Sequence, residues 1–147
     1  MATIKSYTDL EQSKKLAEIL PLESADMVLW GKDFKSVCAD IHAQEFMKGL
    51  EYKKMNYVPC WSLAALMNLL PSEFTEKGEY SETTYEIHIR KYALTDDVDI
   101  YQIAYGNYHW HEDGSCSWSD MINSGQKEEL IDAAFQIVCW LKENNKL

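Results

Sequence analysis

Residues 59–71 read PCWSLAALMNLLP, and this stretch decides how the rest of the chain is interpreted. Between its two prolines only Ser62 and Asn68 are polar. Pro59 suits the first position of a helix, where its missing N–H costs nothing, whereas the second proline cannot continue the helix. Because a helix that is apolar on nearly every side has to be enclosed, we predict a central core helix over Pro59–Leu70, with the other elements packed round it.

Downstream of this stretch the pattern becomes that of β-strands. Thr84–Tyr92 alternates apolar and polar residues, which is typical of a strand with one buried and one wet face. Val98–Trp110 follows after a polar turn and is predicted to pair with it. Asp113-Gly114 predicts a two-residue hairpin turn, because both positions favour positive φ, and this turn folds Ser115–Trp118 back onto the preceding strand.

The remaining segments are mostly helical in pattern. Thr8–Glu11 fits a capping box, which opens a helix that Pro21 ends. Met27–Trp30 is a short β-prone run, whereas Asp33–Leu50 has partly helical spacing and is predicted to be a helix. A last helix is predicted over Gln126–Asn144.

Ser124 is the predicted cap of that last helix. The apolar stripe of the helix consists of Leu130, Ala134, Ile137, Val138 and Leu141. Together these patterns predict an α+β fold: an antiparallel β-meander of about three strands, with the N-terminal, central and C-terminal helices packed mainly on one face. The length of 147 residues suits a single globular domain over residues 1–147.

The composition restricts the classes of partner. The formal charge is −10, which repels phosphate backbones and anionic lipids, so we predict no direct nucleic-acid binding and no membrane association. The opening residues predict no secretory signal, and the four cysteines are scattered without a CxxC pair, so the chain is predicted to be cytoplasmic with free thiols. We predict a protein partner, and a basic one is compatible with this charge.

Three segments resemble a family of small uncharacterised bacterial proteins that prophages and other mobile elements often carry. They are the PCWSLAAL-type run within Val58–Pro71, the opening stretch SYTDLEQSKKLAEILPLESADM, and the two strands followed by a long helix with its apolar run Ala133–Leu141. The resemblance implies a small cytoplasmic protein and brings no assigned activity, ligand or catalytic residue.

The hairpin contains a candidate metal site. A two-residue turn pairs His111 with Cys116 and His109 with Trp118, which places both imidazoles and the thiol on one side. Two imidazoles and a thiolate could hold Zn²⁺, with water or Glu112 as the fourth ligand. The alternative is a solvated hairpin tip whose side chains only pair across strands. No other cofactor is predicted.

Cys60 is a candidate for a catalytic nucleophile. A position in the first turn of the predicted core helix would lower the pKa of its thiol. The alternative is a small buried core residue, because no sequence signature ties a histidine base to Cys60. A small metal-binding or thiol enzyme is therefore the alternative function.

The aromatic residues of the strands give the leading hypothesis. Tyr92, Tyr108, Trp110 and Trp118 are predicted on or near the outer sheet face and the hairpin, where exposed aromatics mark interaction surfaces. With no catalytic signature in the sequence, we predict a non-catalytic, acidic protein-interaction module, and the resemblance implies that mobile elements carry it. A sharper version is that it mimics phosphate charge and antagonises a nucleic-acid-binding protein.

Overall fold

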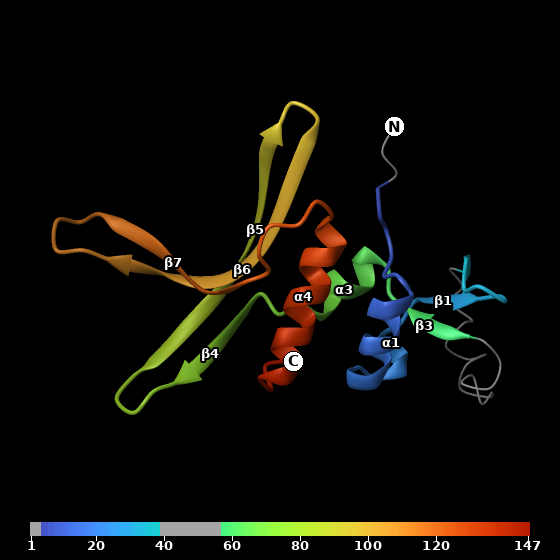
Figure 1. Ribbon diagram of the computed structural model, residues 1–147. Helices are drawn as coiled ribbons and strands as arrows, with labels where there is room; N and C mark the ends of the chain where they lie inside the picture. Colours follow the sequence, from blue (N-terminus) through green and yellow to red (C-terminus); the bar gives the residue numbers. More distant parts are fainter. Residues whose placement is uncertain (1–3, 39–56) are drawn as a thin grey trace. The chain divides into compact units, whose positions relative to one another are not determined.

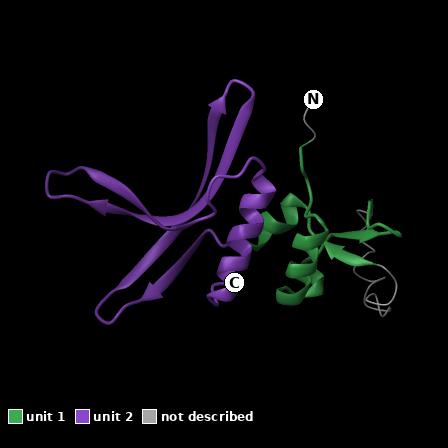
Figure 2. Ribbon diagram, in the orientation of Figure 1, with its two compact units in different colours: residues 1–69 green, residues 70–147 purple. Residues whose placement is uncertain are grey.

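A computed structural model describes residues 4–38 and 57–147, which fall into two compact units, residues 1–69 and 70–147 (Figure 2). The assignment of the whole chain to one domain stays a prediction. Within the described residues, no helix has both the length and the apolar character needed to cross a bilayer.

The first unit combines short helices with a small antiparallel sheet. The strand order is β2-β1-β3, and β1 pairs with both neighbours. The strand predicted at Met27–Trp30 is confirmed as β1. The elements are α1 (Leu10–Ile19), the short 3₁₀ helix η1 (Leu22–Ser24), β1 (Met27–Trp30), β2 (Ser36–Cys38), β3 (Val58–Cys60) and α3 (Leu63–Leu69).

The core helix predicted over Pro59–Leu70 is wrong in its first turn. Val58–Cys60 pairs with β1 instead, and a proline is tolerated there because β3 lies at the edge of the sheet that the described residues form. The helix begins only after Ser62, whose Oγ accepts a hydrogen bond from the backbone N–H of Ala65 at 3.1 Å. Within α3 only Leu66 is fully buried, so the expected enclosure on most sides is also wrong.

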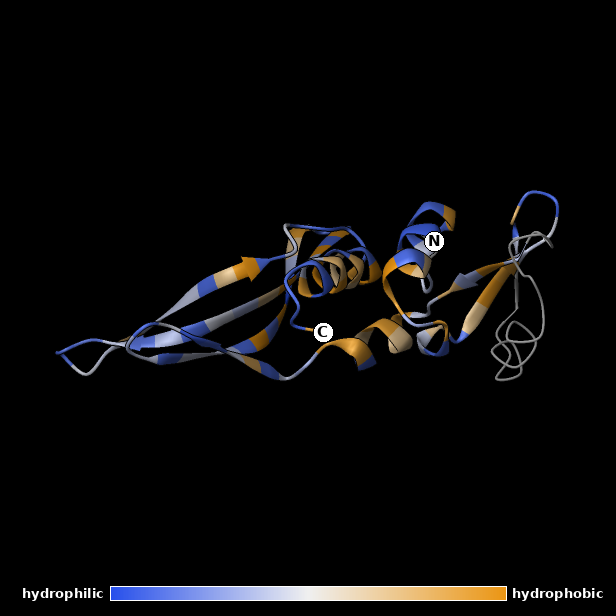
Figure 3. Cartoon of the chain, turned by 90° about the horizontal axis from the view of Figure 1, so that it is seen from below, coloured by the Kyte–Doolittle hydropathy of each residue, from blue (hydrophilic) through white to orange (hydrophobic). Residues whose placement is uncertain are grey.

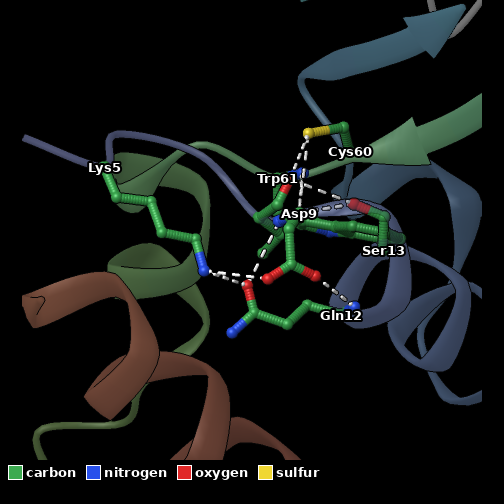
Figure 4. Close-up of polar contacts among 7 residues, drawn as sticks. Lys5, Asp9, Gln12, Ser13, Cys60 and Trp61 are labelled. Carbon is green, nitrogen blue, oxygen red and sulfur yellow. Dashed lines mark hydrogen bonds and ion pairs between the residues drawn. The ribbon is translucent and has the colours of Figure 1, made fainter. Parts of the chain in front are cut away.

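The cap of α1 lies one residue later than predicted. Asp9, rather than Thr8, accepts from the backbone N–H of Gln12 at 2.9 Å, and the Gln12 side chain accepts from the Asp9 N–H at 3.2 Å (Figure 4). Thr8 is buried instead and donates its N–H to the Trp61 carbonyl. Of the helix predicted over Asp33–Leu50, Ser36–Cys38 forms β2, and residues 39–56 lie outside the described residues.

The second unit is an antiparallel meander with one long helix. The strand order is β4-β5-β6-β7, so the predicted meander is confirmed, with four strands where about three were expected. Figure 1 shows the loops of its three hairpins pointing in different directions. The elements are β4 (Glu73–Lys77), β5 (Glu82–Thr95), β6 (Val98–Trp110), β7 (Cys116–Asn123) and α4 (Leu130–Glu143).

Helix α4 covers one face of this sheet, and Figure 3 shows hydrophobic residues along it. The Phe74 ring lies between the sheet and the helix, with its centroid 5.1 Å from Tyr105 and 6.2 Å from Trp140 of α4. Tyr105 is fully buried and donates its hydroxyl to the Pro71 carbonyl at 2.6 Å. We call this side the helix-covered face.

The start of α4 also differs from the prediction. The helix begins at Leu130 rather than near Gln126, and Ser124 does not cap it. The Ser124 Oγ instead accepts the backbone N–H of Ile103 at 3.0 Å, which continues the pairing along β6 beyond β7. The apolar stripe is confirmed from Ala134 to Leu141.

Candidate functional site: an aromatic sheet face

The face of the second sheet opposite Tyr105 carries a group of aromatic rings. We call it the aromatic face, defined by His88, Tyr92, Tyr108, Trp110 and Trp118. Successive residues of a strand alternate between faces, and directly opposed residues share a face. The register Tyr108↔Trp118 therefore places the aromatic residues of β6 and β7 on the same face. Trp110 is 76% exposed, Tyr108 49% and Tyr92 44%, while Trp118 is half-buried.

Three of these rings form a packed cluster. The Trp118 indole stacks on His88 with centroids 3.6 Å apart and planes 12° apart. Tyr108 meets Trp118 edge-on at 5.0 Å and His88 at 6.0 Å. Offset stacking and edge-to-face contacts are the favoured geometries of aromatic pairs, so this part of the face is ordered by its own packing.

Gly106 makes room for the cluster. A Cβ at this position would lie 2.7 Å from Cζ2 of Trp118 and 2.2 Å from the Ser119 carbonyl oxygen. The indole of Trp118, on β7, thus crosses the bare backbone of β6 to reach His88 on β5. A glycine inside a strand is typical of such a close approach.

A polar network holds the indole from its other side. The Asp120 carboxylate accepts the indole N–H of Trp118 at 2.6 Å and a guanidinium N–H of Arg90 at 2.9 Å. Arg90 also donates to the Gln102 side chain at 3.0 Å. The hydrogen bond from Arg90 holds the pKa of Asp120 below its usual value, and Asp120 in turn raises the pKa of Arg90.

A shallow depression of about 500 Å³ lies over this network, lined by His88, Arg90, Trp118 and Asp120. Its only permanent cation, Arg90, is already engaged by a carboxylate. The depression therefore offers little to a phosphate or carboxylate ligand, which would need an uncompensated positive charge.

The unit that carries the aromatic face is acidic. Residues 70–147 contain 15 of the 24 acidic residues and 6 of the 14 basic ones, so this unit carries −9 of the formal charge of −10. Each of the three hairpin loops carries exposed carboxylates: Glu79 in the first, Asp96 and Asp97 in the second, and Glu112 and Asp113 in the third.

The hairpin register differs from the predicted one by one residue. The backbone N–H of His111 donates to Ser115 O at 2.8 Å, and that of Gly114 donates to His111 O at 3.0 Å. Gly114 has φ +81°, whereas Asp113 is not in the positive-φ region, so the loop has three residues instead of the predicted two. Cys116 consequently pairs with Trp110, and the predicted pairing with His111 is wrong.

This register separates the proposed zinc ligands. His109 lies opposite Ser117, away from the aromatic face, and His111 Nε2 lies 2.9 Å from Ser117 Oγ. Cys116 lies on the aromatic face beside Trp110, so the three side chains do not converge. Among the described residues, no group of three or more His, Cys, Asp or Glu is placed to hold a metal ion.

Cys60 lies in β3, so its predicted position in the first turn of a helix is wrong. It is fully buried, and its thiol donates to the Thr8 carbonyl oxygen at 3.3 Å (Figure 4). Burial raises the pKa of the thiol, which disfavours the thiolate that a nucleophile requires. This geometry agrees with the alternative of a small buried core residue.

Sequence reasoning found the exposed aromatics but missed the residues that support them. His88 and Arg90 are among the polar residues of the alternating run Thr84–Tyr92, whose polar side was expected to face water, and nothing in the pattern indicated a ring partner or an ion pair. Gly106 within a strand was a signal for a close approach of another group. No protein-family model, curated protein or solved structure matches this chain, so its function has to be inferred from the geometry.

Proposed function

We propose that the chain is a non-catalytic recognition module that binds a positively charged partner protein through its aromatic face. The observation that carries the proposal is the exposure of Trp110, at 76%, beside the ordered cluster of Tyr108, Trp118 and His88. Large exposed aromatics are enriched among the residues that dominate binding energies.

The charge supports a basic partner. All three hairpin loops of this unit carry exposed carboxylates, and a unit with a charge of −9 attracts cations and accelerates their association. Arg and Lys side chains also bind favourably over the faces of Trp and Tyr rings. The same surface therefore supplies both attraction at long range and contact at short range.

A catalytic role has less support. Cys60 is buried with a raised pKa, and the candidate zinc ligands lie on different faces. The narrower expectation, that the partner is a nucleic-acid-binding protein and that the chain belongs to mobile elements, stays a prediction.

Titration of the full chain with a nine-residue arginine peptide tests the proposal by calorimetry. We expect Trp110→Ala to weaken binding by roughly tenfold, as for a tryptophan at the centre of an interface. The matched control is Tyr80→Ala, which removes another aromatic, 93% exposed, from an acidic hairpin away from this face. The corresponding glutamate peptide should not bind.

Equal affinities of the Trp110→Ala and Tyr80→Ala variants for the arginine peptide would contradict the proposal, since attraction would then come from charge alone. Failure of the arginine peptide to bind at low ionic strength, where surface electrostatics are strongest, would also contradict it.

A further inference from the structure

The two edges of the four-stranded sheet are protected to different degrees. Three of the five residues of β4 are charged, and Lys146 lies 3.1 Å from Glu76 and over the Phe74 ring. Charged side chains, Lys above all, are the usual protection of an edge strand against pairing with another chain. The edge formed by β4 is therefore guarded.

The β7 edge, which we define as the outer backbone of Cys116–Asp120, has no such protection. Strand β7 contains no Lys, Arg or Pro. Its one carboxylate, Asp120, is engaged by Arg90 and Trp118. A bulge interrupts the register only beyond Asp120, so the β7 edge itself is regular.

The backbone groups of this edge point outward at alternate residues. The hydrogen bond from His111 N–H to Ser115 O closes the hairpin, and the antiparallel pattern then pairs Ser117 and Ser119 with β6. The N–H and C=O groups of Cys116 and Trp118 consequently point away from β6. In the described part of the chain, nothing pairs with them.

We propose that the β7 edge accepts an extended segment of the basic partner protein as a fifth, antiparallel strand, with Arg or Lys side chains on the aromatic face. This inference rests on the proposed function and specifies how the partner is held. A fifth strand would lie about 4.8 Å from β7, which brings side chains opposite Trp118 within reach of its ring.

Charge selects the occupant of the edge. A second copy of this chain would bring a second unit with a charge of −9 against the first, which disfavours self-pairing. A basic segment would meet the opposite field and place its cations over aromatic rings. Main-chain hydrogen bonds would supply affinity and alternate side chains specificity, as in other cases of strand addition.

The pairing geometry predicts how the side chains and N–H groups of the added strand are oriented. Residues opposite Cys116 and Trp118 have their side chains on the aromatic face and their N–H groups directed at β7. A peptide Arg-Val-Arg-Thr-Arg-Val-Arg-Thr would therefore bind with its arginine N–H groups toward the edge. N-methylation of the arginines should block pairing, whereas N-methylation of the Val and Thr residues should leave it intact.

Calorimetry of the reduced full chain with these three peptides, which have equal charge, tests the inference. We expect the arginine-methylated peptide to bind at least about tenfold more weakly than the unmodified one, and the Val/Thr-methylated peptide to bind within about twofold. Cys116→Pro, which removes an outward N–H, should weaken binding similarly, and Cys116→Ala should not. Amide exchange of Cys116 and Trp118 should slow when the unmodified peptide is bound.

Equal binding of all three peptides, still weakened by Trp110→Ala, would overturn the strand pairing while leaving the aromatic recognition in place. No binding of any peptide would overturn both. A dimer of the free chain that Cys116→Pro dissociates would overturn the choice of a basic segment as the occupant.

Discussion

The indole of Trp118 occupies the space that a side chain at residue 106 would fill. A Cβ on Gly106 would lie 2.7 Å from the indole and 2.2 Å from the Ser119 carbonyl oxygen, and contacts this short are not tolerated. The stacking of Trp118 on His88 therefore depends on the missing side chain, as in other sheets where an aromatic ring covers a glycine of the neighbouring strand.

Gly106→Ala should destabilise the protein by about 1–3 kcal/mol, because the methyl group forces the indole and the β7 backbone to move. Urea unfolding measures the change. Gly114→Ala provides the comparison: nothing lies within 4 Å of its Cβ, and the cost comes only from φ +81°, about 1 kcal/mol. A smaller loss at Gly106 than at Gly114 would contradict the close approach.

The ion pair between Arg90 and Asp120 predicts a pH dependence of stability. Because the hydrogen bond from Arg90 lowers the pKa of Asp120 in the folded state below 3.8, the charged carboxylate stabilises the fold above about pH 4. This stabilisation disappears as the pH falls through the lowered folded-state pKa. Asp120→Asn should therefore cost about 1–2 kcal/mol at pH 7 and progressively less in acid.

Urea unfolding of wild type and Asp120→Asn between pH 7 and pH 2.5 measures this difference. Asp97→Asn, at an exposed carboxylate without an ion pair among the described residues, is the control and should show a small, flat difference. A difference for Asp120→Asn that does not change with pH would show that the ion pair is unimportant.

The hairpin shows where sequence reasoning succeeded and where it failed. Asp113-Gly114 correctly located the turn, but the dipeptide is compatible with both a two-residue turn and a three-residue loop with one left-handed glycine. The difference is a single residue of register, and a slip of one residue moves every side chain of β7 to the other face. In the observed register, Cys116 therefore does not pair with His111, and Trp118 lies opposite Tyr108.

The helix prediction for the stretch at residues 59–71 was wrong for a different reason. A short apolar run next to a proline fits a helix or a buried strand equally well. Tertiary pairing with β1 makes Val58–Cys60 a strand, and the helix begins only after the capping residue Ser62, whose Oγ donates a hydrogen bond to Asp26. The strand predicted from clear alternation, Thr84–Tyr92, lies within β5, which extends two residues before it and three after it. The bounds of the following strand, Val98–Trp110, were predicted to the residue.

Thiol labelling should separate the cysteines by burial. In the native protein we expect iodoacetamide to modify Cys116, which is exposed, at least about 100-fold faster than Cys60, whose modification requires local opening. A time course with peptide mapping by mass spectrometry measures both rates. Rapid labelling of Cys60 in the native protein at neutral pH would support the alternative function of a thiol enzyme, because burial would then not suppress formation of the thiolate.

Zinc should leave the stability of the protein unchanged. A ligand that binds only the folded state raises the unfolding midpoint with its concentration, but the hairpin register keeps Cys116 away from His109 and His111. Thermal unfolding with one equivalent of Zn²⁺, and after chelation, should give the same midpoint. A zinc-dependent increase that His111→Ala abolishes would contradict the register.

Trp110 and Trp118 should differ in what they contribute to stability. Trp118 stacks on His88, contacts Tyr108 and donates to Asp120, so Trp118→Ala should cost about 2–4 kcal/mol. Trp110 is 76% exposed and has no ring contact or hydrogen bond among the described residues, so Trp110→Ala should change the free energy of unfolding by less than about 0.5 kcal/mol. Urea unfolding of the two variants measures both values. If Trp110→Ala destabilises the fold as much as Trp118→Ala does, the Trp110 side chain serves the fold rather than recognition. Weaker binding of the arginine peptide by Trp110→Ala would then be explained by the loss of structure.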